Sequence, residues 1–265
     1  MNAFGPTGRA IAASWRSAIM TSLAYRVNFL VDAVTTVLWV SWTVLPLLFV
    51  FHGRETVGGW TADEALLVTG FFVCLQGILE AVIDPNLRGL VEDVRNGTLD
   101  FVLLKPVDPQ LLVSFRRLVP AKIVHALAGL GLVVWACTRL PAGPTVMGAL
   151  AAAVLLIFAV VILYSVWLLV ISTAFWFVRV DNLSYLLGSA LDAGRWPVQI
   201  YRPALRLVFT FLFPIGLMTT WPAMALRGLL DLESVGLALV VTVIFAWLGR
   251  RVWVFALRHY ASASS

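Results

Sequence analysis

The sequence predicts an all-α polytopic membrane protein, and three observations support this. Of the 265 residues, 61% are hydrophobic and 12% are charged, whereas soluble domains are about half apolar and about a quarter charged. The mean hydropathy is +0.93. Several apolar runs reach the length of about 20 residues that a helix needs to cross a bilayer. We therefore expect a single membrane domain over residues 1–265, with lipid as part of its solvent.

Six apolar runs are expected to form transmembrane helices. Their expected bounds are 27–51, 66–83, 121–138, 146–178, 205–219 and 235–257. The fourth run would be about 50 Å long as a single helix, against a hydrocarbon core of about 30 Å. Residues 149–178 contain no Gly, Pro, Asn or Asp with which to build a hairpin. We therefore expect one long helix here, tilted or projecting from the membrane.

The basic residues predict the orientation of these spans. If the N-terminus is inside, the inside segments hold all but three of the 19 Lys and Arg residues. The three outside are Arg54, Arg139 and Arg227. Because short loops rich in Lys and Arg stay in the cytoplasm, both termini are expected there. The formal net charge of +5 thus reflects topology, and no nucleic-acid partner is expected.

The segment 1–26 is expected to be a helix that lies in the membrane interface before the first span. Apolar side chains recur at every fourth position from Ile11 to Leu23, with arginines and serines on the other faces. Arginines interrupt the segment, so it lacks the unbroken apolar region of a cleaved signal peptide. The simpler interpretation is an anchor that positions the first span.

A short amphipathic helix is predicted between the second and third spans, over residues 85–96. Asp84 and Pro85 are typical of a helix start, and Gly97 is typical of a left-handed stop. The apolar residues fall on one stripe, which consists of Leu87, Leu90, Val91 and Val94. Three charged residues lie away from the stripe, and these are Arg88, Glu92 and Arg95. Such a helix can lie on the membrane surface or dock into a cytoplasmic partner, and the pattern favours neither.

The sequence RNGTLDFVLLKPVDP follows this helix. Pro106 disfavours helix near its end, and Asp108–Pro109 is expected to start the helix that becomes the third span. An amphipathic helix, this segment and a third span, in that order, resemble the permease subunit of ABC-2 type (type V fold) ABC transporters. The chain is most similar to the bacterial branch with a G-T-L-D…L-L-K-P signature. The resemblance extends over nearly the whole chain and includes the late stretch FPIGLMTTWPAMALRG.

The resemblance implies that residues 85–96 form a coupling helix, which inserts into a groove of a separate ATPase subunit. The residues expected at this contact are Leu87, Arg88, Leu90, Val91, Glu92, Val94 and Arg95. The residues that match the signature and shape the return to the membrane are Gly97, Asp100, Lys105 and Pro106. An outer re-entrant hairpin is also implied between spans five and six, with Pro214 and Pro222 as a candidate gate. A kinked span end without a gating role is the alternative.

The resemblance further implies partners for this chain. The chain contains no G-x-x-x-x-G-K-[ST] motif, so ATP and Mg²⁺ are expected on two copies of a separate ABC ATPase and not here. A second permease subunit, identical or related, would complete the pathway. No enzyme activity, cofactor or metal is expected in this chain. It would export an amphipathic or hydrophobic substrate by alternating access across a bacterial cytoplasmic (inner) membrane.

Two acidic residues, Asp32 and Glu80, fall near the cytoplasmic ends of predicted spans. Acids inside a membrane often have a function. We favour ion pairs with nearby Arg26, Arg88 or Lys122; facing a central cavity, the two acids would instead attract cationic amphiphiles. The stretch 180–203 is too polar to cross and is expected to run along the cytoplasmic interface.

Two other function classes remain as alternatives. An ion-coupled secondary transporter usually has internal repeats and broken midplane helices, and the sequence shows neither. A membrane-embedded lipid-modifying enzyme needs a nucleophile or a metal, but the sequence has no H-E-x-x-H or G-x-S-x-G motif and no clustered histidines. Dependence of transport on a separate ATPase distinguishes these classes from an ABC permease.

Overall fold

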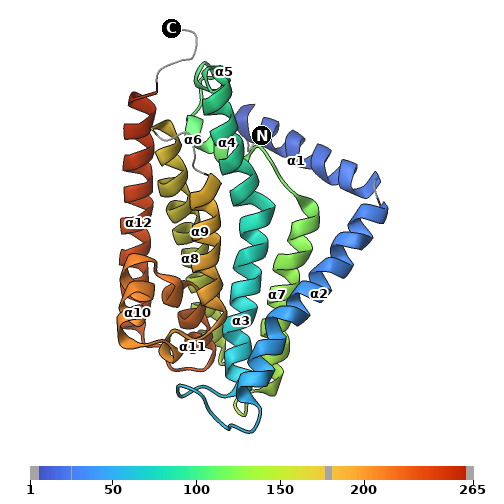
Figure 1. Ribbon diagram of the computed structural model, residues 1–265, viewed down its shortest axis with the longest axis vertical. Coiled ribbons are helices and arrows are strands. Elements are labelled where there is room, and N and C mark those ends of the chain that lie inside the picture. The colour runs from blue at the N-terminus through green and yellow to red at the C-terminus, as the bar shows by residue number, and fades with distance from the viewer. Residues whose placement is uncertain (1–5, 25, 177–180, 261–265) are drawn as a thin grey trace.

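The computed structural model describes residues 6–24, 26–176 and 181–260, and this part of the chain is helical apart from loops and one isolated β-bridge. Five long helices form the body of the molecule (Figure 1). They are α2 (Arg26–Phe51), α3 (Ala62–Ile78), α7 (Pro120–Arg139), α8 (Val146–Ser172) and α12 (Leu232–Arg258). α2, α7, α8 and α12 each contain an apolar segment long enough to cross a membrane, and α3 does so together with the helix that continues it to Asn96. The chain is therefore a polytopic membrane protein.

The two ends of the bundle carry different elements (Figure 1). The first, here called the α4 end, carries α1 (Pro6–Ala24), α4 (Asp84–Asn96), α5 (Asp100–Leu103) and α6 (Pro109–Phe115). The second, here called the α11 end, has the loop 52–61 and α11 (Trp221–Leu226). The last turn of α12 also lies at the α4 end, so the first and last described helices both reach that end (Figure 1).

α1 lies across the α4 end and is attached to the link between α6 and α7. Ser14 Oγ donates a hydrogen bond of 2.6 Å to the carbonyl of Arg116, and Trp15 Nε1 donates one of 2.7 Å to the carbonyl of Phe115. Further along α1, the side chain of Leu23 is 63% exposed. An outward apolar surface on a transverse helix suits a membrane interface.

α4 continues directly from α3. One π-helical turn, η1 (Leu79–Ile83), joins them, and the resulting helix runs for 35 residues from Ala62 to Asn96. Asp84 therefore does not cap a new helix as expected; its carboxylate pairs with Arg88 at 2.8 Å. At 1.5 Å per residue the helix is about 50 Å long, so α4 projects beyond a hydrocarbon core of about 30 Å.

The π turn accommodates Pro85, which has no backbone N–H and whose ring displaces the carbonyl four residues earlier. That carbonyl, of Ala81, instead accepts a hydrogen bond of 2.9 Å from the backbone N–H of Val119. The side chain of Asn86 donates to the carbonyl of Val82 at 2.6 Å. The carbonyl that the proline leaves without a partner in the helix is thus hydrogen-bonded by the segment before α7, and the helix continues past Pro85.

The apolar stripe of α4 faces the core of this same chain. Leu87 and Leu90 are fully buried and Val91 is 5% exposed, because α4 packs against α6 and α8. Val94 is partly buried against the same core. The stripe is therefore covered largely by α6 and α8 of this chain, and the polar face is the more accessible side of α4.

α6 and α7 are separate helices. The Asp108 carboxylate caps α6 by accepting a hydrogen bond of 2.8 Å from the N–H of Gln110. α6 nevertheless ends at Phe115, and α7 begins at Pro120. The expected single helix from Asp108 into the third span is thus interrupted at residues 116–119.

α8 is one long helix, as its lack of helix-breaking residues indicates. It runs to Ser172 and continues as a 3₁₀ turn, η2 (Thr173–Phe175); residues 177–178 of the predicted run lie outside the described residues. α12 packs along α8. From α12, the two terminal nitrogens of Arg250 lie 3.1 and 2.6 Å from the carboxylate of Asp108, which ties α12 to α6.

The chain next runs from the α4 end to the α11 end, through α9 (Asp181–Asp192) and the 3₁₀ turns η3 (Ala193–Arg195) and η4 (Val198–Ile200). Near the α4 end, the Arg88 guanidinium lies 5.9 Å from the Tyr185 ring. At the α11 end, Ile200 packs against the loop 52–61. The expectation that this stretch follows the interface is wrong.

Polar residues of this crossing stretch are paired within the bundle, which explains how it enters. Arg195 Nη2 lies 2.8 Å from the Asp192 carboxylate, and the carbonyl of Arg195 accepts a hydrogen bond of 3.1 Å from Thr69 on α3. Charges are tolerated at membrane depth where they pair and face protein.

A bent helix pair follows at the α11 end. Its first arm is α10 (Pro203–Leu207) with the π turn η5 (Val208–Leu212), and its second arm is η6 (Gly216–Thr220) with α11. The arms meet at an angle of 81°. The straight fifth span expected over 205–219 is therefore not formed.

The two arms of the pair differ in burial. In the first arm Phe211 is 71% exposed, whereas in the second arm Met218 and Ala223 are fully buried. The second arm is fixed by Arg227, whose Nε lies 2.8 Å from the Glu64 carboxylate on α3, both side chains being mostly buried. The Arg227 guanidinium also lies 4.3 Å from the ring of Trp60.

α3 and α7 approach each other through glycines. A Cβ atom on Gly77 would lie 2.2 Å from the backbone nitrogen of Ala126, and one on Gly129 would lie 2.2 Å from that of Cys74. Since carbon and nitrogen cannot approach so closely, only glycine fits at either position. The two backbones are in direct contact, and this contact fixes the register of α3 against α7.

Candidate functional site

A charged cluster lies where η1 meets α7. Glu80 Oε2 lies 2.9 Å from Lys122 Nζ, and Gln76 Nε2 donates a hydrogen bond of 3.0 Å to Glu80 Oε1. His125 Nδ1 is 3.6 Å from the Glu80 carboxylate, beyond hydrogen-bonding distance. Of the ion-pair partners expected for Glu80, the structure places Lys122 beside it.

Two cavities adjoin this cluster, and both are lined by Trp39 and Glu80. The first, here called the α2 cavity, has a volume of about 180 Å³ and is also lined by Asp32, Lys122 and His125. The second, here called the α9 cavity, has a volume of about 340 Å³ and is also lined by Trp167, Tyr185, Asp192 and Arg195. Polar and aromatic side chains thus surround space within the helical bundle.

Trp39 forms the wall between the two cavities. Its ring meets that of His125 edge to face, with centroids 4.6 Å apart. The Arg195 guanidinium lies 5.9 Å from the Trp39 ring centroid, and the Phe72 ring stacks at 6.1 Å. These contacts hold the indole in a fixed orientation.

Asp32 lines the α2 cavity from α2. It also lines an open hollow of about 720 Å³ beneath α1, which is bordered by Ser14, Thr21 and Arg116. Among the side chains that the structure describes, Asp32 has no ion-pair partner. The side chain of Arg26, one expected partner, lies outside the described residues.

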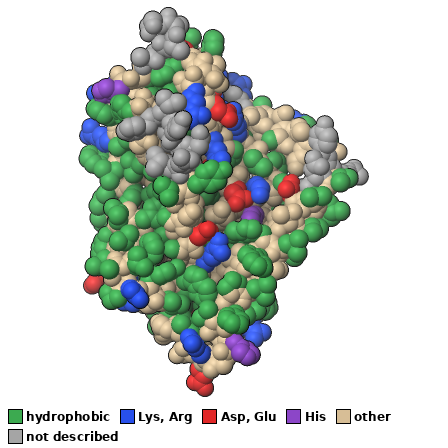
Figure 2. Space-filling model, viewed as in Figure 1, with side chains coloured by type: hydrophobic (Ala, Val, Ile, Leu, Met, Phe, Trp, Pro, Cys, Tyr) green, Lys and Arg blue, Asp and Glu red, His purple; other side chains and the backbone are tan. Residues whose placement is uncertain are grey.

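Charged side chains gather at mid-height on one face of the molecule. Figure 2 shows acidic, basic and histidine side chains there, surrounded by hydrophobic side chains. Exposed apolar residues of α2, such as Val37 and Trp42, are at least 65% exposed. The polar cavities therefore lie within a part of the surface whose other side chains suit lipid or a second apolar partner.

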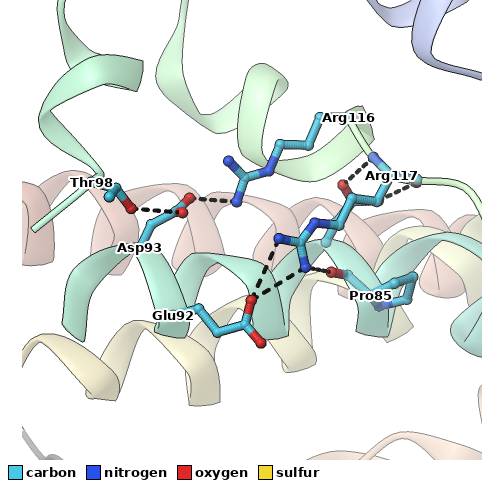
Figure 3. A network of polar contacts seen from close by, with 7 residues as sticks. Pro85, Glu92, Asp93, Thr98, Arg116 and Arg117 are labelled. Atoms are coloured by element: carbon cyan, nitrogen blue, oxygen red, sulfur yellow. Dashed lines mark hydrogen bonds and ion pairs between the residues drawn. The ribbon is translucent and has the colours of Figure 1, made fainter. Parts of the chain in front are cut away.

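A second polar network joins α4 to the link between α6 and α7 (Figure 3). Arg116 forms an ion pair with Asp93, and Arg117 reaches Glu92 at 3.4 Å. Asn86 Nδ2 donates a hydrogen bond of 2.7 Å to the backbone carbonyl of Arg117, and Asn86 Oδ1 accepts one of 2.8 Å from the backbone N–H of Arg117. The charges of α4 on this side are therefore directed at its own chain.

The segment after α4 presents exposed apolar side chains at the α4 end. Gly97 ends α4 with φ at +67°, in the left-handed region that glycine adopts readily. Beyond it, Phe101 is 69% exposed and Leu104 is 81% exposed. Lys105 and Pro106 are exposed as well. These two apolar side chains are a surface that the sequence pattern alone did not single out.

A family model described as ABC-2 family transporter protein matches residues 37–264. The chain belongs to the ABC-2 transporter family. No curated protein and no solved structure matches it. Membership makes the chain a transport component, the permease of an ABC transporter, and implies association with an ABC ATPase.

In this ABC-2 permease, the two prolines considered for a gate occupy different places. Pro214 lies at the bend between the two arms of the helix pair, and Pro222 is the second residue of α11. Both are buried. The pair enters from the α11 end and returns to it, because Arg227 at its close is held by Glu64 near the start of α3.

Some site residues of the permease were missed by pattern analysis. His125 and Trp39 carry no sequence signal of their own, since both lie in apolar runs. Gln76 precedes Glu80 by one helical turn, a spacing that places two side chains on one helix face. The pairing of Lys122 with Glu80 depends on the contact between α3 and α7, which single-helix periodicity does not show.

Proposed function

We propose that this chain is the membrane-spanning permease subunit of an ATP-driven exporter in a bacterial cytoplasmic membrane. Two copies of an ABC ATPase bind ATP and Mg²⁺, and a second permease, identical or related, completes the pathway. The α4 end and both termini face the cytoplasm. The substrate is amphipathic or hydrophobic and crosses by alternating access.

The observation that best supports this proposal is the continuous helix from Ala62 to Asn96. It begins at the α11 end, passes Glu80 at the cavities, and extends past an apolar core of about 30 Å. In the proposed mechanism the two ATPase subunits move together when they bind ATP. A rigid helix transmits that movement to the transmembrane helices, which then shift as rigid bodies.

The ATPase contact proposed here comes from the polar face of α4 and from the exposed side chains of Phe101 and Leu104. The apolar stripe of α4 is covered by α6 and α8, so Leu87, Leu90 and Val91 hold α4 in place without meeting a partner. Exposed aliphatic and aromatic side chains at the tip of a rigid projection are suited to fill a pocket on another subunit.

Leu104→Asp tests this surface. Because Leu104 is 81% exposed, the variant is expected to fold with an unchanged melting temperature. Its affinity for the ATPase that co-purifies with the wild-type chain is expected to fall by about tenfold or more, and stimulated ATP hydrolysis should fall with it. The matched control is Leu229→Asp, at the α11 end, where the leucine is 56% exposed.

Two outcomes contradict the proposal. If Leu104→Asp binds the ATPase as tightly as the wild type does, the contact surface is wrong. If purified wild-type chain, reconstituted alone, transports its substrate against a gradient without any ATPase, the function itself is wrong.

A further inference from the structure

Three adjoining hollows form a polar route from the α4 end to the middle of the molecule. The open hollow beneath α1 and the α2 cavity share Asp32 in their walls. The α2 cavity and the α9 cavity share Trp39 and Glu80. Asp32 therefore lies at the entrance, where the outer hollow meets the inner part of the route, which consists of the α2 and α9 cavities.

The charges along this route leave one carboxylate without a counterion among the described side chains. Glu80 pairs with Lys122 at 2.9 Å, and Asp192 pairs with Arg195 at 2.8 Å. At the α4 end, Asp84 pairs with Arg88. The two arginines that line the hollow are paired as well, Arg116 with Asp93 and Arg117 with Glu92. Among the side chains of the route that the structure describes, Asp32 therefore remains as the one unpaired carboxylate, and it lies at the entrance.

The inner part of the route is also lined by buried polar groups that have no hydrogen-bond partner among the described residues. His125 is 4% exposed and neither of its ring nitrogens is hydrogen-bonded; Trp167 is 2% exposed and its Nε1 is likewise unpaired. Buried polar groups normally have partners, so these three nitrogen atoms are available to a polar group on a ligand. The Trp39 ring already has one guanidinium near it, and aromatic rings attract cations.

We propose that this route binds an amphipathic organic cation, whose positively charged group is recognised by Asp32 as it enters from the membrane interface beneath α1. The charged group then lies beside Trp39, with His125 and Trp167 within the cavities that it enters. The apolar part of the molecule contacts the exposed apolar side chains of α2. This assignment rests on the proposed function, since it names the class of substrate that the permease carries.

Binding of tetraphenylphosphonium to the purified full chain in phosphatidylcholine nanodiscs tests the proposal, after subtraction of binding to protein-free nanodiscs. The wild type is expected to bind saturably, and tetraphenylborate, with the same rings and the opposite charge, is expected not to compete. Asp32→Asn is expected to weaken binding by about tenfold or more, and Asp32→Glu by less than about threefold. Glu55→Gln, an exposed acid of the loop 52–61, serves as the control and should bind as the wild type does.

The proposal is overturned if tetraphenylborate competes as well as unlabelled tetraphenylphosphonium does, or if folded Asp32→Asn binds as tightly as the wild type. The first comparison needs no variant, so it holds even if Asp32→Asn fails to fold. The assay contains no ATPase and no transport step. Saturable cation binding by a chain that never associates with an ATPase would therefore refute the proposed function alone, whereas loss of cation selectivity in an ATPase-coupled complex would refute this inference alone.

Discussion

The glycine contact between α3 and α7 can be tested with two substitutions on the same helix. Gly129 and Gly131 both lie inside α7. A Cβ atom on Gly129 would lie 2.2 Å from the backbone nitrogen of Cys74, whereas one on Gly131 would have no atom within 4 Å. Gly129→Ala and Gly131→Ala therefore make the same chemical change in two different surroundings.

The expected magnitudes follow from this geometry. Replacing glycine by alanine inside a helix stabilises by about 0.5–1 kcal/mol in either case. At Gly129 the methyl group must gain more than about 1 Å of space from a backbone, which cannot rotate away, and such overpacking costs about 1–3 kcal/mol. Because the gain is the same at both positions, the two variants differ by the overpacking cost alone. We expect Gly131→Ala to be slightly stabilising and Gly129→Ala to be less stable than it by about 2 kcal/mol, the middle of that range.

Thermal unfolding in detergent, followed by tryptophan fluorescence, measures the difference. For a chain of this size 1 kcal/mol corresponds to about 2–4 °C in melting temperature, so the two variants should differ by about 4 °C or more. Gly77→Ala should behave like Gly129→Ala, because its Cβ would lie 2.2 Å from the backbone nitrogen of Ala126.

Equal shifts of the same sign at Gly129 and Gly131 would show that α3 and α7 do not touch through their backbones. In that case the register that brings Glu80 to Lys122 would also lose its explanation.

Two further predictions concern ion pairs that tie distant elements together. Arg227→Met should lower the free energy of unfolding by about 3 kcal/mol, because it leaves the mostly buried Glu64 carboxylate without its partner; adding Glu64→Gln should recover part of the loss in the same melting assay, and no recovery would contradict the pairing. The Arg250 guanidinium holds the pKa of Asp108 below its ordinary value of 3.8, so the stabilisation is complete above about pH 5 and is lost as the pH falls through the lowered pKa. The melting-temperature difference between wild type and Arg250→Gln should therefore be constant from about pH 7 to pH 5 and shrink below about pH 4, whereas a difference that grows with acid would refute the assignment.

Much of the helical layout could be predicted from the sequence, because hydropathy reports continuous apolar runs directly. α8 is the simplest case, because residues 149–178 contain no Gly, Pro, Asn or Asp that would interrupt a helix. Gly97 ended α4 where its left-handed preference indicated, with φ at +67°. These are local properties of the chain, which periodicity and backbone chemistry describe well.

The bent pair and the α9 crossing could not be predicted in the same way. The second arm of the pair is as apolar as a span but is covered by protein, and hydropathy does not distinguish lipid from protein as the surroundings. α9 presents the opposite problem, since Asp192 and Arg195 make the stretch polar in sequence although they neutralise each other in the fold. Each case depends on a tertiary partner.

The apolar stripe of α4 shows the same limit for the site. The positions of Leu87, Leu90 and Val91 indicated correctly that one face of the helix is covered, but periodicity does not say by what. Glu80 was recognisable as an acid inside an apolar run, whereas its ion-pair partner Lys122 lies more than forty residues later, on α7. The register set by Gly77 and Gly129 is what brings them together.

The irregular link at residues 116–119 has a consequence for how shape can change. Side chains from α1 hold the carbonyls of Phe115 and Arg116, Asn86 holds both polar backbone atoms of Arg117, and Val119 is bonded to Ala81. Because these hydrogen bonds fix the backbone of the link, it is rigid and does not serve as a hinge. The helices that it joins are therefore expected to move together as one block.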